Sequence, residues 1–476
     1  MSLRRCLAEF AVLIVLAALA AVGCSPAPCY PIPTEAQVEW QKMEMNMFVH
    51  FGPNTFSGLE WGTGQEAEDL FRPTALDCRQ WARTAKAAGM KGIILTAKHH
   101  DGFCLWPNPV STHCAKDVDV LKELSDACRE EGLKFGVYIS PWDRNDPAYG
   151  TAEYNEKYAE TLRSVHNGRY GPVFEHWFDG ACGEGPNGKK QEYDWPLFNR
   201  TVSELQPDAI QFSDVGPGCR WVGNERGEAG ETNWSMLNVD GYTPGLGAPP
   251  VSSLSQGDEN GERWIPAEAD VSIRPGWFWR SSEDGRLKTV EQLMDIYYSS
   301  VGRNALLLLN VPADTTGRIP AADSLRLMEF RRQLDSVFAR NLAVRVHGHG
   351  RRLLDGDFDS YSVLRRPSFE VALDGPMTFN RILLQEYIPL GQRVRAFRVE
   401  ALSPDGAWTD IATGTTIGYK RILLLPETTA TRLRITVTSS RAVPILSEVG
   451  VYIQQKNHRR YCDGANIYRV CLRDRA

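Results

Sequence analysis

Apolar runs alternate with amphipathic stretches over the first two thirds of the chain, at the spacing of strands and helices. Several runs are apolar almost throughout, as strands buried on both faces of a parallel sheet are. An α/β fold of about 300 residues with this alternation suits a (β/α)8 TIM-like barrel, which we predict over residues 34–340. The predicted strands are 46–51, 92–97, 134–140, 174–179, 209–213 and 305–311, and the predicted helices are 78–88, 118–131, 153–165, 195–205, 289–301 and 322–338.

Residues 216–276 interrupt this alternation. The segment is rich in Gly, Pro and Trp and shows little periodicity of either kind. Long irregular segments inside a compact domain are usually functional. We therefore predict that these residues form loops on the catalytic face of the barrel, which is the face at the carboxyl ends of the strands.

The pattern changes again near residue 341, where short alternating segments are separated by turns such as Asp374-Gly375 and Asp405-Gly406. Alternation with period two and Asp-Gly turns is typical of antiparallel strands. We predict a C-terminal antiparallel β-sandwich over 341–455, followed by a basic tail over 456–476. The clearest of its strands are 368–373, 381–385, 396–401, 421–425 and 432–437.

The first 23 residues have the pattern of a lipoprotein signal peptide. Arg4 and Arg5 precede an apolar run over 10–22 that is too short to span a bilayer. Small residues then precede Cys24, which we predict to be the lipidated N-terminus, with an ordinary cleaved signal as the alternative. A proline-rich tether follows over 24–33. We expect an exported, lipid-anchored protein, periplasmic or on the outer membrane, that meets the membrane only through this anchor.

Charge and cysteine content narrow the functional classes. The formal net charge of -6 argues against nucleic-acid binding, which needs a basic face. Eleven cysteines include Cys24 and one in the signal, and Cys462 and Cys471 lie close enough in sequence to pair. No CxxC pair or His/Cys set has zinc-ligand spacing. We expect neither a metal nor a cofactor.

Polar side chains end four successive predicted strands. His50 ends the first, and Tyr138 and Asp179 lie at the ends of the third and fourth. The second ends in the triplet 99–101, which is His99, His100 and Asp101. A lone histidine is more often structural than functional, but barrel enzymes keep their chemistry at these strand ends. We therefore predict one site that contains all four clusters.

Two chemistries can use such a set. A metal-dependent hydrolase would bind its ion with His99, His100 and Asp101. Adjacent side chains on a strand point to opposite faces, which argues against that reading. The other chemistry is glycoside hydrolysis by paired carboxylates. Asp179 is the candidate nucleophile, and Glu175 and Trp177 share its side of the strand.

The motifs together resemble glycoside hydrolase family 29, the retaining α-L-fucosidases, across nearly the whole barrel. They are the segments 48–52 (FVHFG), 60–62 (EWG), 98–103 (KHHDGF), 136–140 (GVYIS) and 177–181 (WFDGA). The resemblance implies that Asp179 is the nucleophile. It also implies a group of fucose-binding residues, to which we add Trp177 and Trp221 as neighbours. The group implied by the family is His50, Glu60, Trp61, His99, His100 and Tyr138. Trp277 and Trp279 match an aromatic stretch near the methyl group of the sugar in the family, and the resemblance leaves open which of the two faces the sugar.

The general acid/base is less fixed in the family. Segment 220–227 (RWVGNERG) resembles the stretch that carries it in one subfamily, which points to Glu225. Trp221 would help to raise the pKa of Glu225 by desolvation. Glu228, Glu231 and Glu268 are the rival candidates.

The resemblance also carries expectations about substrate. Segments 183–191 (GEGPNGKKQ) and 193–195 (YDW) resemble the subfamily that prefers α-1,3/1,4-linked fucose on branched glycans, although a plain glycine-rich surface loop would look the same. The implied reaction is hydrolysis of terminal fucose by double displacement through a covalent fucosyl-enzyme. A non-catalytic lipoprotein that binds fucosylated glycans is the alternative. The sandwich resembles galactose-binding-like domains, and whether it binds glycans stays open.

Overall fold

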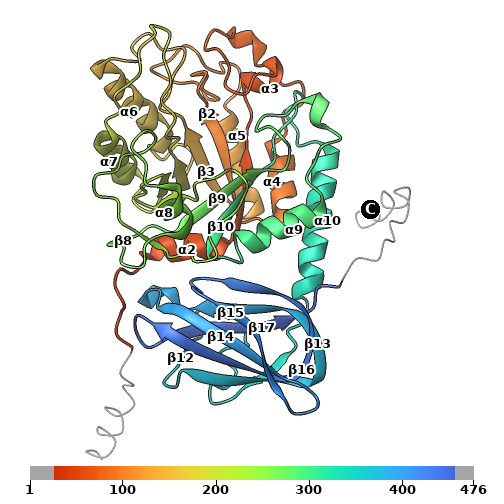
Figure 1. Cartoon of the computed structure of the whole chain (residues 1–476). Helices are drawn as coiled ribbons and strands as arrows, with labels where there is room; N and C mark the ends of the chain where they lie inside the picture. The colour runs from red at the N-terminus through yellow and green to blue at the C-terminus, as the bar shows by residue number, and fades with distance from the viewer. Residues whose placement is uncertain (1–25, 456–476) are drawn as a thin grey trace, which may run out of the picture.

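The computed structural model describes residues 26–455, which form a barrel stacked on a smaller β domain (Figure 1). The predicted signal peptide, the lipidation site Cys24, the basic tail 456–476 and the pair Cys462 and Cys471 lie outside the described residues. The described part of the proline-rich segment lies against the β domain, where Cys29 N–H donates to the Leu390 carbonyl at 2.9 Å.

Eight parallel strands close the predicted TIM-like barrel, each hydrogen-bonded to its neighbours in the order β1-β10-β9-β6-β5-β4-β3-β2. Most of their residues are buried, because one face meets the barrel interior and the other meets the surrounding helices. The strands are β1 (Met45–Val49), β2 (Gly92–Lys98), β3 (Lys134–Ile139), β4 (Val173–Trp177), β5 (Ile210–Ser213), β6 (Cys219–Trp221), β9 (Ala267–Ser272) and β10 (Ala305–Asn310).

Helices between the strands cover the barrel, and local sequence signals fix their ends. Asp77 and Asp119 cap α4 and α5 by accepting backbone N–H bonds, and Gly132 ends α5 in the left-handed conformation. A further helix, α2, was not predicted and begins at the capping box of Thr34. The helices are α2 (Glu35–Met43), α3 (Pro53–Ser57), α4 (Cys78–Ala87), α5 (Val120–Glu131), α6 (Ala152–His166), α7 (Trp195–Leu205), α8 (Val251–Gln256), α9 (Val290–Ser299) and α10 (Ala321–Phe338).

The irregular segment 216–276 is only partly a loop, because it also contains two barrel strands. β6 has three residues, and β9 reads AEADVS in sequence. Alternate residues of β9 are polar but buried, since Glu268, Asp270 and Ser272 all lie at low exposure. A three-residue strand and a strand with a polar interior face both lack the apolar signature that the sequence prediction relied on. The rest of the segment carries α8 and the hairpin of β7 (Met236–Leu237) and β8 (Arg263–Trp264).

The C-terminal domain is the predicted antiparallel sandwich, and two long strands bend through both of its layers. The first half of β13 (Ser368–Glu386) pairs with β11 (Ala343–Val346), and its second half pairs with β17 (Ile445–Tyr452). β16 (Arg421–Ser440) runs alongside β13 with register shifts near residues 372–381. Buried residues of both layers form one hydrophobic core. The remaining strands are β12 (Ser362–Val363), β14 (Val394–Leu402) and β15 (Trp408–Gly414).

The sandwich meets the barrel at the end where the strands begin. Glu44, just before β1, accepts a hydrogen bond from Tyr419 at 3.1 Å and forms an ion pair with Lys420. Asn304, just before β10, accepts from the backbone N–H of Tyr419 at 2.7 Å. The opposite end of the barrel, where the strands finish, is therefore free of the sandwich.

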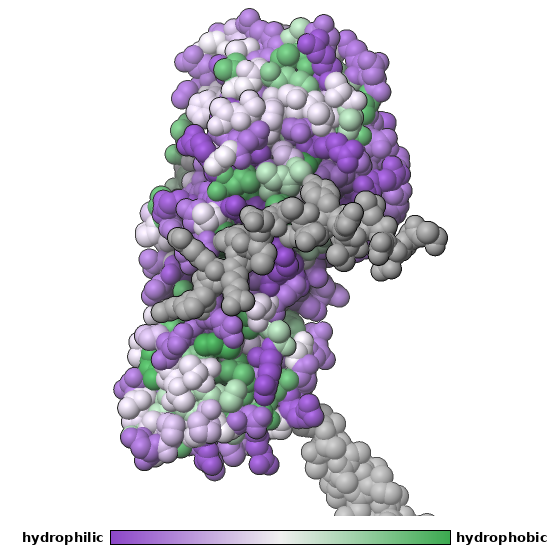
Figure 2. Space-filling model, turned by 90° about the vertical axis from the view of Figure 1, so that its right-hand side faces the viewer, coloured by the Kyte–Doolittle hydropathy of each residue, from purple (hydrophilic) through white to green (hydrophobic). Residues whose placement is uncertain are grey.

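The surface is mainly hydrophilic on the face that Figure 2 shows, with hydrophobic residues in small separate groups. In the part of the chain that the structure describes, none of the helices is both long enough and apolar enough to cross a bilayer.

Candidate active site

A cavity of about 180 Å³ lies at the carboxyl ends of the barrel strands and gathers most of the predicted site residues. Its size suits one small ring, and its walls combine aromatic faces with carboxyl and imidazole groups. Nine of the predicted residues line it, together with Phe48, Ala181 and Asp270. The nine are His50, Trp61, His99, His100, Tyr138, Trp177, Asp179, Glu225 and Trp277.

Asp179 follows β4 and is held by three neighbours. Tyr138 donates its hydroxyl to Oδ2 of Asp179 at 2.9 Å, and the backbone N–H of Ala181 donates to Oδ1 at 2.7 Å. His100 Nε2 lies 3.8 Å from the same Oδ2. The side chain keeps 25 % of its surface exposed, towards the cavity. Asp179 is thus an oriented carboxylate with a free approach, as a nucleophile requires.

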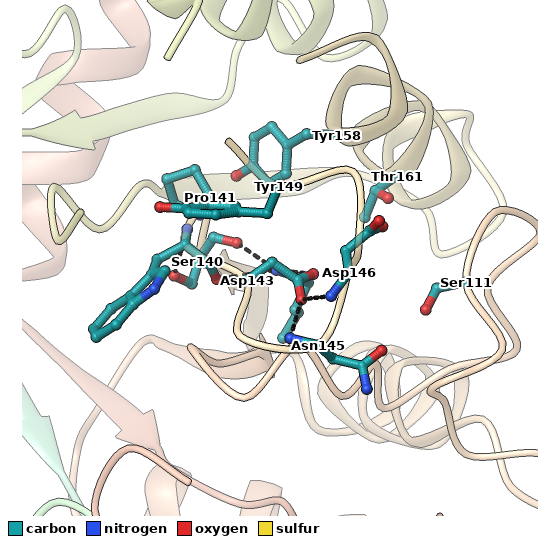
Figure 3. Close-up of polar contacts among 12 residues, drawn as sticks. Ser111, Ser140, Pro141, Asp143, Asn145, Asp146, Tyr149, Tyr158 and Thr161 are labelled. Carbon is teal, nitrogen blue, oxygen red and sulfur yellow. Dashed lines mark hydrogen bonds and ion pairs between the residues drawn. The ribbon is translucent and has the colours of Figure 1, made fainter. Parts of the chain in front are cut away.

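His100 is held in turn by the loop that follows β3. Its Nδ1 lies 2.8 Å from the hydroxyl of Ser140, and that hydroxyl oxygen also accepts the backbone N–H of Trp142 at 3.1 Å. Asp143 stiffens the loop by accepting the backbone N–H groups of Asn145 and Asp146 (Figure 3). We assign the proton of neutral His100 to Nε2, which faces Asp179, because Ser140 is then free to donate to Nδ1.

The three cavity histidines are neutral. Burial lowers the pKa of His50 to about 3 and that of His100 to about 4, and it holds the pKa of His99 well below its usual range. His50 is fixed by Nδ1, which lies 2.8 Å from Oδ1 of Asn310 at the end of β10. Neutral imidazoles both donate and accept hydrogen bonds, so these side chains suit sugar hydroxyls.

The sequence argument that His99 and His100 point to opposite faces was wrong. β2 ends at Lys98, so both histidines lie in the following turn, where strand alternation no longer applies. Their rings lie 4.1 Å apart and line one cavity. Asp101 points elsewhere and accepts the backbone N–H of Phe103. Within residues 26–455, the side chains that gather three possible metal ligands are Glu175, Cys219 and Glu268, not these three.

Glu225 lies across the cavity from the strand-end cluster, in the loop after β6. Its Oε2 accepts the indole N–H of Trp277 at 3.4 Å. Partial burial raises the pKa of Glu225, and the nearby carboxylates of Asp179 and Glu60 add to that rise. A carboxyl with a raised pKa in the same cavity as a second, oriented carboxyl is the arrangement of a general acid and a nucleophile.

The rival acid/base candidates lie elsewhere. Glu228 is exposed and pairs with Arg226, and Glu231 faces Arg303 near the sandwich. Glu268 is fully buried in the barrel interior, where it accepts the indole N–H of Trp177 at 2.8 Å. None of the three lines the cavity, so Glu225 is the candidate that the geometry favours.

A second, open cavity of about 470 Å³ adjoins the first and shares Trp61, Glu225 and Trp277 with it. Glu60 lines this second cavity and does not line the smaller one. Its carboxylate accepts the backbone N–H of Trp277 at 2.6 Å and pairs with Arg280, so it positions the aromatic wall. Trp61 is 57 % exposed between the two cavities.

Two predicted tryptophans do not line either cavity. Trp221 donates its indole N–H to Asp270 at 2.8 Å. Trp279 donates to Asp284 at 3.2 Å, on the other side of Phe278. Residues 277 and 279 lie in an irregular turn after β9, and only Trp277 turns towards the site. Sequence spacing alone could not separate the two.

Two cavity groups escaped the sequence analysis. Asp270 lines the cavity from β9, and Asn310 holds His50 from the end of β10. Asn310 ends a predicted strand, which is the signal that identified the other site residues. Asp270 had no such signal, because β9 itself was not predicted.

A pair of fully buried glutamates lies beneath the cavity. Glu175 accepts the indole N–H of Trp40 at 2.7 Å, and Glu268 accepts that of Trp177. Burial raises the pKa of Glu175 to about 7. Burial also raises the pKa of Glu268 well above its usual range, and the charge of Glu175 adds to that rise. Within residues 26–455 no Lys, Arg or His nitrogen forms an ion pair with either carboxyl, so the pair retains a proton at neutral pH.

This pair predicts a pH-dependent stability. The folded chain binds a proton that the unfolded chain releases above about pH 4.5, so the wild type loses stability as the pH rises from there through about 7. Glu175→Gln cannot ionise at this position. As the pH rises across that window, the free energy of unfolding of the variant relative to that of the wild type should therefore increase by up to roughly 3 kcal/mol. Thermal unfolding at pH 5 and pH 8 measures this. Exposed Glu228→Gln is the control, and a pH-independent difference for Glu175→Gln would refute the shared proton.

A family model and several known proteins are similar to this chain. The family model described as Alpha-L-fucosidase matches residues 28–336. Alpha-L-fucosidase 1 of Arabidopsis thaliana is 40 % identical over 457 residues, covering 90 % of this chain and 89 % of that protein. A glycoside hydrolase 29 family member from an unknown rumen bacterium has a TM-score of 0.82 and 41 % identity over 93 % of this chain and 79 % of its own. A GH29 fucosidase of Ruminococcus gnavus in complex with fucose has a TM-score of 0.82 and 33 % identity, covering 91 % of this chain and 97 % of its own.

Proposed function

Because the chain belongs to glycoside hydrolase family 29, the alpha-L-fucosidases, we propose that it releases α-1,3- or α-1,4-linked fucose from branched glycans. The hydrolysis of fucosidic bonds follows from the family. The linkage, the catalytic pair and the location of the enzyme are the proposal.

The proposed catalytic pair is Asp179 and Glu225. The carboxylate of Asp179 attacks the anomeric carbon while Glu225 gives its proton to the leaving oxygen, which forms a covalent fucosyl-enzyme. Glu225, now ionised, takes a proton from water, and that water displaces Asp179 to release fucose with retained configuration. Oriented Asp179 and the raised pKa of Glu225 support these roles.

The double cavity is the observation that carries the linkage proposal. The smaller cavity suits the fucose ring, and the open one begins beyond Glu225, where the leaving group must lie. Trp61 and Trp277 belong to both walls, so a sugar in the open cavity would contact an aromatic face. A branched glycan places a second sugar beside the fucose, and the open cavity of about 470 Å³ has the volume for it.

Segment 183–191 supports the same substrate. It folds as a short loop closed by the hydrogen bond from Gly185 N–H to the Lys189 carbonyl at 2.8 Å. Trp142 donates its indole N–H to the Glu184 carbonyl at 3.1 Å, and its ring lies 5.9 Å from that of Trp61. A β-carbon on Gly183 would lie 2.0 Å from the Trp142 ring, so glycine is required for this contact. The loop thus supports Trp61 at the mouth of the open cavity.

Comparing three substrates tests this proposal. We expect kcat/KM for a Lewis-type branched trisaccharide to exceed that for a linear α-1,2-fucosylated trisaccharide by at least roughly tenfold, because only the branch fills the open cavity. An aryl α-L-fucoside controls for the fucose site itself. Trp61→Ala should lower the preference for the branched glycan. Equal rates on the two trisaccharides, or a preference for the linear one, would contradict the proposal.

The alternatives from the sequence are less consistent with the structure. A protein that only binds glycans has no need of Asp179 and Glu225 in one cavity, and the family is one of enzymes. A metal-dependent hydrolase would need His99, His100 and Asp101 to converge, and Asp101 points away from the cavity.

We also propose that the enzyme is exported and lipid-anchored at Cys24. The support is the sequence alone, in which a short apolar run ends in small residues before this cysteine. Partition between detergent and aqueous phases tests it. The wild type should enter the detergent phase and Cys24→Ala should not. A wild type that stays in the aqueous phase would contradict the anchor.

A further inference from the structure

Asp270 is a third carboxyl in the fucose cavity, and the catalytic scheme above gives it no role. It lies on β9, whose neighbour β6 leads into the loop of Glu225. It lines the cavity together with Asp179 and Glu225 while only 4 % of its own surface is exposed. A charged group so deeply buried is costly unless it is paired, so its protonation state needs an explanation.

The carboxyl of Asp270 accepts from one side chain and from its own backbone N–H. Trp221 donates its indole N–H to Oδ1 at 2.8 Å. Across residues 26–455 no Lys, Arg or His nitrogen forms an ion pair with this carboxyl. The titratable groups that face it are Glu225 from the loop after β6, Asp179 from the end of β4 and Glu268 from β9 itself. All of them are acids.

Burial and these acidic neighbours together keep Asp270 neutral. Burial is the main cause that raises its pKa to about 8, and the charges of Glu225 and Asp179 add to the rise. Asp179 must be ionised to attack the sugar, so of the two aspartates that line the cavity Asp270 is the one that retains its proton at neutral pH. One oxygen of a neutral carboxyl accepts a hydrogen bond while the other donates one.

We propose that Asp270 is a substrate-binding residue that acts as a hydrogen-bond donor to an oxygen of the bound fucose. Oδ1 accepts the indole N–H of Trp221, which fixes the plane of the carboxyl and leaves the protonated Oδ2 for the sugar. The inference rests on the proposed pairing of Asp179 with Glu225. It adds neutral Asp270 to that scheme, beside Asp179 and Glu225, whose charges change during the reaction.

A neutral Asp270 also has a consequence for the two-step reaction. Glu225 must hold its proton in the first step and give it up before the second. The charge on Asp179 raises the pKa of Glu225 and disappears when the fucosyl-enzyme forms. A permanent charge at position 270 would hold the proton on Glu225 in both steps. Because protonated Asp270 carries no charge, the pKa of Glu225 can fall when Asp179 loses its charge in the first step.

Two substitutions separate a neutral donor from a carboxylate. Asp270→Asn keeps an oxygen for Trp221 and places an N–H towards the sugar, whereas Asp270→Ala removes both. We measure L-fucose affinity by calorimetry and kcat/KM on an aryl fucoside at pH 6. Asp270→Ala should weaken both by at least about tenfold, and Asp270→Asn by only about threefold. Exposed Asp240→Asn is the matched control, and thermal unfolding of each variant verifies the fold.

The pH dependence of fucose affinity gives a second readout. Affinity of the wild type should fall as the pH rises through about 8, because Asp270 loses its proton there and gains a charge beside Asp179. Asp270→Asn retains Glu225 and Asp179 but cannot ionise at position 270, so its affinity should fall less over the same range. The proposal is wrong if Asp270→Asn binds fucose as weakly as Asp270→Ala, or if neither variant loses affinity. Because binding is measured without turnover, these results stay separate from any failure of the catalytic pair.

Discussion

Asp179→Gly should hydrolyse an aryl α-L-fucoside roughly 10⁴-fold more slowly than the wild type, or worse. The substitution removes the carboxylate that would attack the anomeric carbon, and no other carboxylate is held there by Tyr138 and the backbone of Ala181. Turnover on an activated aryl fucoside, followed by release of the phenol, measures this. The cavity should still bind L-fucose, since the histidines that line it remain.

Azide provides the control for that variant. The space left by the missing carboxylate admits a small anion, which can attack the anomeric carbon from the same side. We expect azide to restore part of the phenol release and to yield fucosyl azide of inverted configuration. An Asp179→Gly variant with nearly full activity would show that another group attacks the sugar. Asp270 would then be the next candidate, because it is the other aspartate that lines the cavity.

Glu225→Gln should lower kcat/KM on a branched oligosaccharide by roughly 10²–10⁴-fold, because a sugar leaving group needs a proton. The loss should be much smaller on an aryl fucoside whose phenol leaves without one. The second step would then limit turnover, since no base remains to activate water, and azide should accelerate it. Paired assays on the two substrates measure this contrast.

Glu228→Gln is the matched control for Glu225, because it changes a glutamate three residues away that lies outside the cavity. Its activity on both substrates should equal that of the wild type. If Glu225→Gln instead lost activity equally on both substrates and showed no response to azide, the acid/base would have to be another residue.

The parts of the fold that were predictable are those that bury apolar residues in a regular pattern. β2 is apolar almost throughout, and its carboxyl end locates His99 and His100. Asp179 could be placed because it follows a strand whose neighbours were also predicted. In a closed barrel, side chains at successive strand ends must meet at one face. Most residues of the candidate site were therefore predictable from the sequence.

The parts that were not predictable depend on details finer than periodicity. β9 carries glutamate, aspartate and serine on its interior face, so its pattern is typical of a loop. Asp270 was therefore not predicted as a site residue. β2 ends at Lys98, one residue before His99, so both histidines lie in the turn that follows and can share a cavity. The turn after β9 decided that Trp277 and not Trp279 lines the cavity. Each of these depends on where a strand stops, which sequence patterns locate only to within a few residues.

Trapping the covalent intermediate tests the central claim most directly. A 2-deoxy-2-fluoro-fucosyl fluoride forms the fucosyl-enzyme through its good leaving group, and the fluorine slows the hydrolysis of that intermediate. Peptide mapping by mass spectrometry then locates the label. The account predicts one fluorofucosyl group on the peptide that contains Asp179, bonded to its carboxylate, and none in Asp179→Gly. A label on Glu225 or Asp270, or wild-type turnover of this reagent without any labelled peptide, would contradict it.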